Sequence, residues 1–265
     1  MVLVHAALHS VAHRPWPLPS GPWIMVQTWH DLLFAHWPLP AATLRPLVPS
    51  QLALDAFDGR CWVGVAPFHM SGIRLRGLPA LPWTSHFPEL NLRTYVTCGG
   101  RPGVYFFSLD AGNLWAVWAA RTFYGLPYYH ARMRVEFGNH WIGYTCHRCF
   151  SSQDQAGGNQ DRADFRGRYR PITAVQLRPS GSLEHWFTER YCLYTAKSGS
   201  IWSAEIHHPQ WPLQDAEAEI QTNTVALASG ISLPQVPPRL HFAKKLEVLI
   251  WPLHRVSTAH GDPTN

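Results

Sequence analysis

The chain has 265 residues, of which 46% are hydrophobic and 15% charged, and it carries a formal net charge of +5. This composition excludes a disordered chain and suffices for one large hydrophobic core. Thirteen Trp and 23 Pro favour an α+β, β-rich fold with few short helices. The basic residues are scattered and only three are lysines, so the sequence does not predict nucleic-acid binding.

Cysteine usage and the two ends of the chain indicate the compartment and the domain organisation. Five cysteines leave one unpaired in any disulfide scheme, and a chain of this size needs no disulfide staples. Histidines and Arg14 interrupt the apolar residues of the N-terminus, so neither a signal peptide nor a membrane span is expected. We therefore predict a cytoplasmic protein with a flexible N-terminal tail (1–22), a single domain (23–258) and a C-terminal tail (259–265).

In the first half of the domain, short apolar or alternating runs are separated by proline and glycine. This pattern predicts a first strand over 29–36 and a short helix over 43–48. Three further strands are expected at residues 62–68, 90–96 and 103–109. Asn113 can then cap a helix, LWAVWAARTFY, which ends at Gly125. Because this helix is apolar on nearly every side, we expect it to be buried.

The second half continues with a predicted hairpin, RMRVEF and WIGYTCHRCF, joined through Gly138 and Asn139. A polar, glycine-rich loop over 151–161 precedes a basic strand, FRGRYRP. Ser182 is expected to cap a helix over 184–195. The segments SIWSAEIHH and KKLEVLIWPL are the last predicted strands.

The predicted strand LNLRTYV carries a polar stripe on one face. Side chains two residues apart share a face of a strand, so Leu90, Leu92 and Val96 should face the core. The stripe then either faces solvent, as on an ordinary half-buried strand, or lines the interior of a closed sheet and suits a small polar ligand. Its members are Glu89, Asn91, Arg93 and Tyr95.

A series of motifs over roughly residues 25–256 resembles the uncharacterised YqjF-like family in order and spacing. The motifs are HDLLFAHWPL, LRPLVPSQLALDAFDG, FPELNLRTYV, GVYFFSLDA, RTFYGLPYYHARM, TERYCLYT and EIHHPQWPL. That family in turn is similar to the acetoacetate decarboxylase-like superfamily. The resemblance implies a curved sheet or cone-shaped barrel that encloses a small-molecule cavity.

The segment GLPYYH, Gly125 to His130, departs from the superfamily pattern. True decarboxylases of the superfamily have an aromatic-Pro-Lys-Lys turn that supplies a Schiff-base lysine. Here Tyr128 and Tyr129 occupy the two lysine positions. A phenol cannot form an imine with a ketone, so Schiff-base decarboxylation is not expected. The tyrosines either donate hydrogen bonds to a carbonyl or enolate oxygen, or only fill the interior.

Two further features bear on the site. The resemblance places Glu89, in FPELNL, at an active-site carboxylate, whereas the superfamily's N-terminal arginine has no clear counterpart near Trp37 and Pro38. His207 and His208 are adjacent, so at most one of them can face a given cavity. A metal would need further ligands such as His36, His130 or Glu205, and we predict no metal and no cofactor.

Two functions follow as hypotheses. The first is an enzyme that performs acid-base chemistry on a carbonyl or carboxylate compound, with catalytic residues Glu89, Tyr128 and Tyr129. The second is a non-catalytic protein that binds a small molecule between tryptophan walls. The predicted partner is a small molecule rather than a nucleic acid or a membrane, and the formation of a homo-oligomer is left open. The predicted ligand-binding residues are Asn91, Arg93, Tyr95, His36, His207 and His208.

Overall fold

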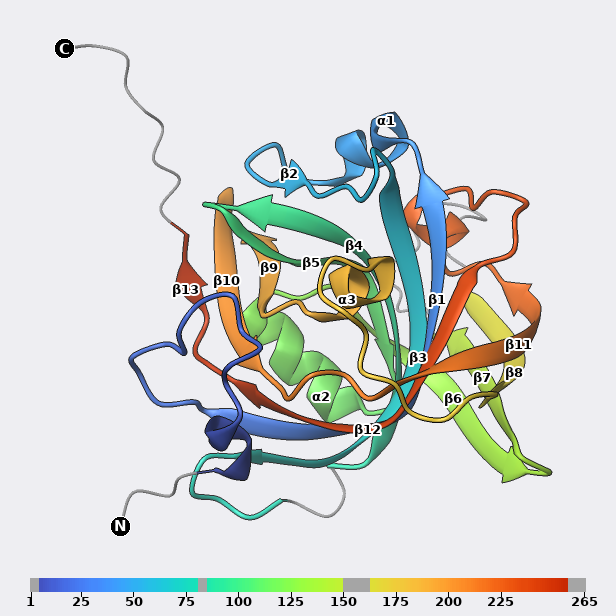
Figure 1. Ribbon diagram of the computed structural model, residues 1–265, viewed down its shortest axis with the longest axis horizontal. Helices are drawn as coiled ribbons and strands as arrows, with labels where there is room; N and C mark the ends of the chain where they lie inside the picture. The colour runs from blue at the N-terminus through green and yellow to red at the C-terminus, as the bar shows by residue number, and fades with distance from the viewer. Residues whose placement is uncertain (1–4, 81–84, 150–162, 257–265) are drawn as a thin grey trace.

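The computed structural model describes residues 5–80, 85–149 and 163–256 (Figure 1). The predicted loop over 151–161 and the predicted tail over 259–265 lie outside the described residues. Within the described residues no helix is long and apolar enough to cross a membrane.

Strands dominate the fold, as the composition predicts. They are β1 (Met25–Leu39), β2 (Ala53–Leu54), β3 (Cys61–Leu75), β4 (Phe87–Cys98), β5 (Arg101–Ala111), β6 (Tyr128–Gly138), β7 (Trp141–Arg148), β8 (Asp164–Pro171), β9 (Cys192–Lys197), β10 (Ser200–His207), β11 (Leu213–Asn223), β12 (Arg239–Ile250) and β13 (His254–Arg255). The α-helices are α1 (Ala41–Leu44), α2 (Leu114–Ala119) and α3 (Leu183–Thr188), and α2 continues as a π-helical turn over Ala120–Tyr124.

The strands form one curved sheet whose pairings close on themselves twice. Strands β5, β4, β3, β1 and β12 form a continuous wall. One circuit returns from β12 to β5 through β10 and β9, and the other returns through β11, β8, β7 and β6. The predicted curved sheet is therefore confirmed, although the two circuits share a wall rather than making one simple ring.

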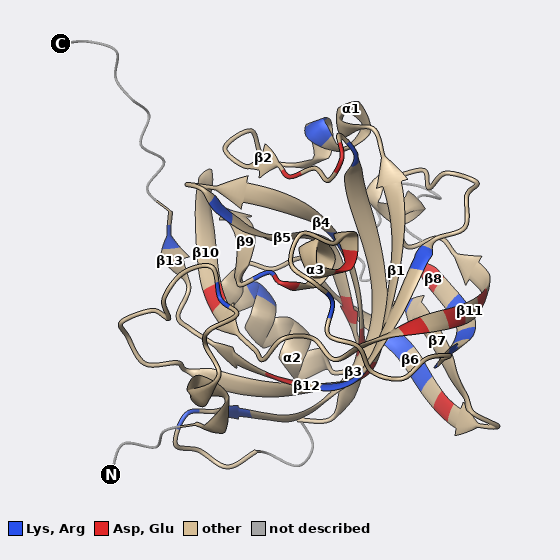
Figure 2. Cartoon of the chain, viewed as in Figure 1, with Lys and Arg blue, Asp and Glu red and all other residues tan. Residues whose placement is uncertain are grey.

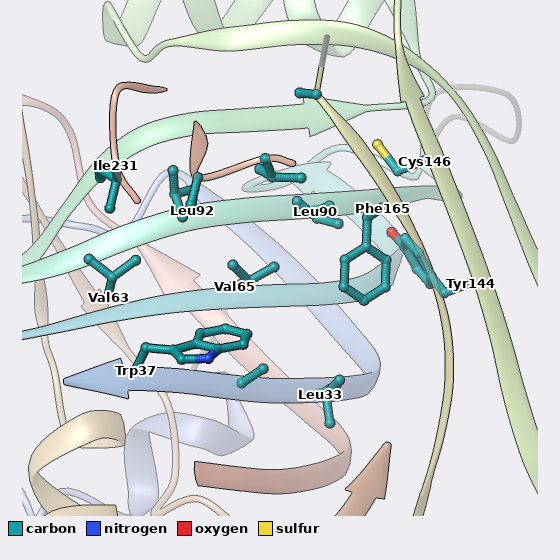
Figure 3. Packing of buried hydrophobic residues seen from close by; sticks show 14 of the residues in the cluster. Leu33, Trp37, Val63, Val65, Leu90, Leu92, Tyr144, Cys146, Phe165 and Ile231 are labelled. Carbon is teal, nitrogen blue, oxygen red and sulfur yellow. The ribbon is translucent and has the colours of Figure 1, made fainter. Parts of the chain in front are cut away.

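The shared wall separates two interiors. Successive side chains of a strand point to opposite faces, so each shared strand contributes to both sides. We call the side closed by β6, β7, β8 and β11 the packed compartment, because the largest hydrophobic cluster fills it (Figure 3). We call the side closed by β9 and β10 the hollow compartment. Figure 1 shows α2 and α3 within its outline.

Two helix predictions are wrong in part. Asn113 caps α2, with its side chain accepting hydrogen bonds from the backbone N–H groups of Trp115 and Ala116, as predicted. The helix is largely exposed rather than buried, however: Leu114, Trp115 and Trp118 are each more than half exposed, and the two tryptophans also border a cavity. The predicted helix over 184–195 ends at Thr188, and Cys192–Lys197 instead extends into β9, which pairs with both β5 and β10.

The predicted loose tail does not describe residues 5–22. Arg14 is buried and donates hydrogen bonds to the Ile206 carbonyl and to Glu205. Ala7, Leu8 and Leu18 pack against a cluster around Trp23 and Trp251. Tertiary contacts with β10 and β12 therefore order a segment that has no regular sequence pattern.

Charged residues are numerous on the outer strands of the packed compartment, where both signs alternate (Figure 2). Arg168 pairs with Glu219, and Arg170 pairs with Glu217. Two of the arginines of the basic strand β8 thus have acidic partners on β11.

Candidate functional site

The hollow compartment contains a cavity of about 500 Å³. Apolar side chains from β1, β3, β5, β12 and α2 form most of its wall. This volume and this mixture of many apolar and few polar groups are typical of small-molecule sites. The wall residues with a charged, amide, hydroxyl or imidazole group are Gln27, Glu89, Asn91, Arg93, Tyr124, Tyr128, Thr188, Arg190 and His208.

Strand β4 supplies the charged stripe of the cavity. Glu89, Asn91 and Arg93 line it and are only 3%, 5% and 7% exposed. Leu90 and Leu92, between them, point into the packed compartment. The alternation in the sequence thus has a hydrophobic core on one side and a cavity on the other, and the solvent-facing alternative for these residues is wrong.

Glu89 forms a pair with Tyr128, whose hydroxyl donates a hydrogen bond of 2.8 Å to Glu89 Oε2. Strand β6 starts at Tyr128 and lies parallel to β5, which brings Tyr128 beside β4. Burial raises the pKa of Glu89 to about 8, even though the hydrogen bond from Tyr128 acts to lower it. Burial also raises the pKa of Tyr128 well above its usual value, so the phenol remains a neutral donor.

The backbone at Glu89 is held from the packed compartment. The Tyr144 hydroxyl lies 2.7 Å from the Glu89 carbonyl oxygen and 2.9 Å from that of Phe68. Phe68 and Glu89 face each other across the β3–β4 pair. Tyr144 therefore fixes the strand position from which the Glu89 carboxyl group enters the cavity.

Arg93 has no carboxylate partner among the described residues. Its guanidinium carbon lies 5.1 Å from the centre of the Phe34 ring and 5.9 Å from that of Tyr95. Arg93 Nε and the neighbouring Asn91 Oδ1 are buried without a hydrogen-bond partner in the structure. Buried groups of this kind are normally satisfied, so this part of the wall suits a polar ligand, and the guanidinium suits an anionic one.

Arg190 adds a second guanidinium to the wall. It forms an ion pair with Asp55 through Nη1, whereas its buried Nη2 has no hydrogen-bond partner among residues 5–80, 85–149 and 163–256. The sequence did not single out Arg190 or its neighbour Thr188. Thr188 is the last residue of α3 and Arg190 follows it, both in the TERYCLYT segment, and Arg190 reaches the cavity only because the helix ends at Thr188.

Tyr95 and His36 lie behind Arg93 rather than in the cavity wall. Tyr95 Oη and His36 Nε2 are 2.6 Å apart, and the imidazole stacks on the Phe187 ring with the two ring centres 3.8 Å apart. Burial, with Arg93 nearby, lowers the pKa of His36 well below its usual value, so the ring is neutral. A Cβ atom at Gly64 would lie 2.8 Å from this ring, so the strand needs a glycine there. Tyr95 and His36 therefore support Arg93 and do not line the cavity.

In each of the pairs Tyr128–Tyr129 and His207–His208, one side chain lines the cavity and the other does not. Tyr129 does not line the cavity; its ring lies 3.9 Å from the guanidinium carbon of Arg148, which forms two hydrogen bonds with Asp110. The sequence predicts Tyr129 as a catalytic residue, and the structure contradicts this prediction because Tyr129 donates no group to the cavity. His208 lines the cavity, whereas His207 lies within 2.9 Å of the Ala7 carbonyl and outside the wall.

Neither a lysine nor a metal cluster is found at the site. The three lysines of the chain, Lys197, Lys244 and Lys245, are all described, and none lines the cavity. Among residues 5–80, 85–149 and 163–256, no group of three or more His, Cys, Asp or Glu side chains could hold a metal ion.

Comparison with known proteins places the chain in a family. Residues 26–247 match the DUF2071 family, described as an uncharacterized conserved protein. The chain is 49% identical over 240 residues to the uncharacterized protein YqjF of Bacillus subtilis, which covers 91% of this chain and 96% of that protein. It therefore belongs to the DUF2071 family, and its predicted YqjF-like membership is confirmed.

Solved structures show the same fold at low sequence identity. An acetoacetate decarboxylase-like enzyme from Sphingomonas wittichii RW1 matches with a TM-score of 0.59 and 14% identity, over 93% of this chain and 100% of that one. The enduracididine biosynthesis enzyme MppR complexed with pyruvate matches with a TM-score of 0.57 and 9% identity, over 93% of this chain and 97% of that one. The acetoacetate decarboxylase-like fold predicted from the motifs is thus confirmed.

Proposed function

We propose that this member of the DUF2071 family is an enzyme that performs acid-base chemistry on a small carboxylate compound with a carbonyl group. One observation carries the proposal: the Glu89–Tyr128 pair shares a cavity wall with Arg93, a buried guanidinium without a carboxylate partner in the part of the chain that the structure describes. A proton carrier, a neutral hydrogen-bond donor and an anion-binding group are the parts that such chemistry needs.

The roles follow from the chemistry of each group. Arg93, with Asn91 beside it, binds the carboxylate of the substrate. When the substrate binds, the Tyr128 hydroxyl turns its single hydrogen bond from Glu89 to the carbonyl oxygen and stabilises the negative charge that develops there. Glu89 takes the proton from the carbon next to the carbonyl and returns it. A pKa of about 8 suits this role, because the carboxyl group then exchanges protons near neutral pH.

The fold neighbours support the substrate class by analogy alone. One is called an acetoacetate decarboxylase-like enzyme, and another is described as complexed with pyruvate, a carboxylate with a carbonyl group. The mechanism proposed here differs from Schiff-base chemistry, because the chain offers no lysine to this cavity. No cofactor takes part in the proposed steps.

The alternative function is non-catalytic binding of a small molecule. The largely apolar wall, with Trp29, Trp115, Trp118 and Trp211, favours it, since aromatic side chains supply binding area without chemistry. Turnover separates the two functions.

Proton exchange in D₂O tests the proposal directly. Incubation with a panel of α-keto and β-keto acids, followed by proton NMR, should show deuterium incorporation next to the carbonyl, faster with the protein than in buffer. Glu89→Gln should abolish the acceleration, and Arg93→Met should weaken it. Arg168→Ala, which alters an exposed ion pair on β8, is the matched control and should behave like the parent. Exchange that is unaffected by Glu89→Gln would contradict the enzyme hypothesis, and binding without exchange would favour the alternative.

A further inference from the structure

The cavity has a polar end that is buried. On β4, Arg93 faces Gly64 of β3, and Glu89 faces Phe68 four residues further along β3. Phe187, in α3, lines the cavity and is 1% exposed. The groups without hydrogen-bond partners, Asn91 Oδ1, Arg93 Nε and Arg190 Nη2, belong to this end.

The opposite end is apolar. Beyond Phe68, β3 continues for seven residues to Leu75, roughly 23 Å at about 3.3 Å per residue. Leu75 faces Met25 of β1, and Met25 faces Ile250 of β12, so the three residues form a row across the wall. All three line the cavity, together with Met70, Ile73 and Phe87. Gln27, which hydrogen-bonds Trp29 Nε1, is the polar exception on this part of β1.

The apolar end is also the accessible one. Leu75 is 53% exposed and Trp115, at the start of α2, is 73% exposed, although both line the cavity. A cavity that served only a short, fully polar acid would leave this wall without a function. The distribution instead matches a ligand with a charged head and a long apolar tail.

We infer that the substrate class is an amphipathic monocarboxylate, with its carboxylate at Arg93 and an apolar tail that extends past Phe68 toward Leu75 and Trp115. This inference rests on the proposed function, because it uses Arg93 as the carboxylate-binding group. It adds that short acids such as butyrate fill only the polar end.

Chain-length dependence of binding tests the inference. Isothermal titration calorimetry of the full chain with butyrate and with decanoate, below its micellar concentration, gives the two dissociation constants. Each buried methylene adds roughly four-fold in affinity, so decanoate should bind at least about ten-fold more tightly even if only two of its additional methylenes are buried.

Variants locate the tail. Ile73→Trp fills the apolar end and should remove most of the decanoate advantage while butyrate binding stays unchanged. Met25→Trp, on the neighbouring strand, should act in the same way and serves if Ile73→Trp does not fold. Arg93→Met should weaken both ligands about equally, whereas Arg168→Ala should weaken neither. Circular dichroism confirms the fold of each variant.

The outcomes separate the inference from its premise. Equal affinities for butyrate and decanoate, or a decanoate advantage that survives both tryptophan variants, would overturn the amphipathic substrate class but leave carboxylate binding at Arg93 intact. Failure of both acids to bind, or unchanged binding by folded Arg93→Met, would overturn the carboxylate site itself and the inference with it.

Discussion

The packed and hollow compartments share the strands of one wall, but one face of these strands is covered by a hydrophobic cluster and the other borders a cavity. In the packed compartment Leu90 and Leu92 belong to one hydrophobic cluster with Tyr144, Phe165 and Tyr169 of β7 and β8. In the hollow compartment Glu89, Asn91 and Arg93 of the same strand border a cavity of about 500 Å³ and retain unpartnered polar atoms. One strand therefore supplies stability through one face and a candidate site through the other.

Adjacent residues on β4 give the sharpest test of this contrast. Leu92→Ala should lower the free energy of unfolding by about 2–5 kcal/mol, because it removes a fully buried side chain from a close-packed cluster. Asn91→Ala should change it by less than about 1 kcal/mol, because the amide oxygen makes no hydrogen bond that could be lost. Urea denaturation measures both values. Equal losses would show that the hollow compartment is as tightly packed as the other.

Glu89 should make stability depend on pH. Its folded pKa, about 8, lies above its ordinary value of 4.5, so the folded state binds the proton more tightly. Stability from this group is present below about pH 4.5 and is lost as the pH rises toward about 8. Relative to the parent, Glu89→Gln should therefore gain roughly 2–4 kcal/mol between about pH 5 and pH 9. Urea denaturation at both pH values measures the difference, and a difference that does not change with pH would contradict the buried carboxyl.

Substitutions of the paired tyrosines should differ in their effect on proton exchange, because only Tyr128 lines the cavity. Tyr128→Phe removes the cavity hydroxyl that donates to Glu89 and should slow keto-acid proton exchange by about 10²-fold or more. Tyr129→Phe keeps the ring on Arg148 and should change the exchange rate by less than about two-fold. The rates are compared by NMR in D₂O at equal protein concentration. A larger effect at Tyr129 would reverse the assignment.

The last prediction is that an attempt to trap a Schiff base gives no adduct. Incubation with acetoacetate and borohydride should leave the mass of the intact protein unchanged, because an imine needs a lysine and none of the three lines the cavity. An acetoacetate decarboxylase with a Schiff-base lysine is the positive control. A stable adduct at Lys197, Lys244 or Lys245 would restore the decarboxylase hypothesis.

Several features of the fold could be predicted from the chain itself. The alternation in FPELNLRTYV separates Leu90 and Leu92 from Glu89, Asn91 and Arg93, because the period of a strand is two in any context. The motifs identified the family and the acetoacetate decarboxylase-like fold. The absence of lysine from GLPYYH is likewise visible in the sequence alone.

Other features required the tertiary structure, because they depend on which distant strand lies opposite a given face. The sequence could not decide whether the polar stripe of β4 meets solvent or a cavity, since the closure of β5, β9, β10 and β12 around it decides this. It could not distinguish Tyr128 from Tyr129, because only the pairing of β6 with β5 turns one toward Glu89 and the other toward Arg148. The same reason explains the wrong expectation for α2. Its sequence is apolar on nearly every side and therefore predicts a buried helix. Whether other elements pack against that apolar surface depends on the assembled fold.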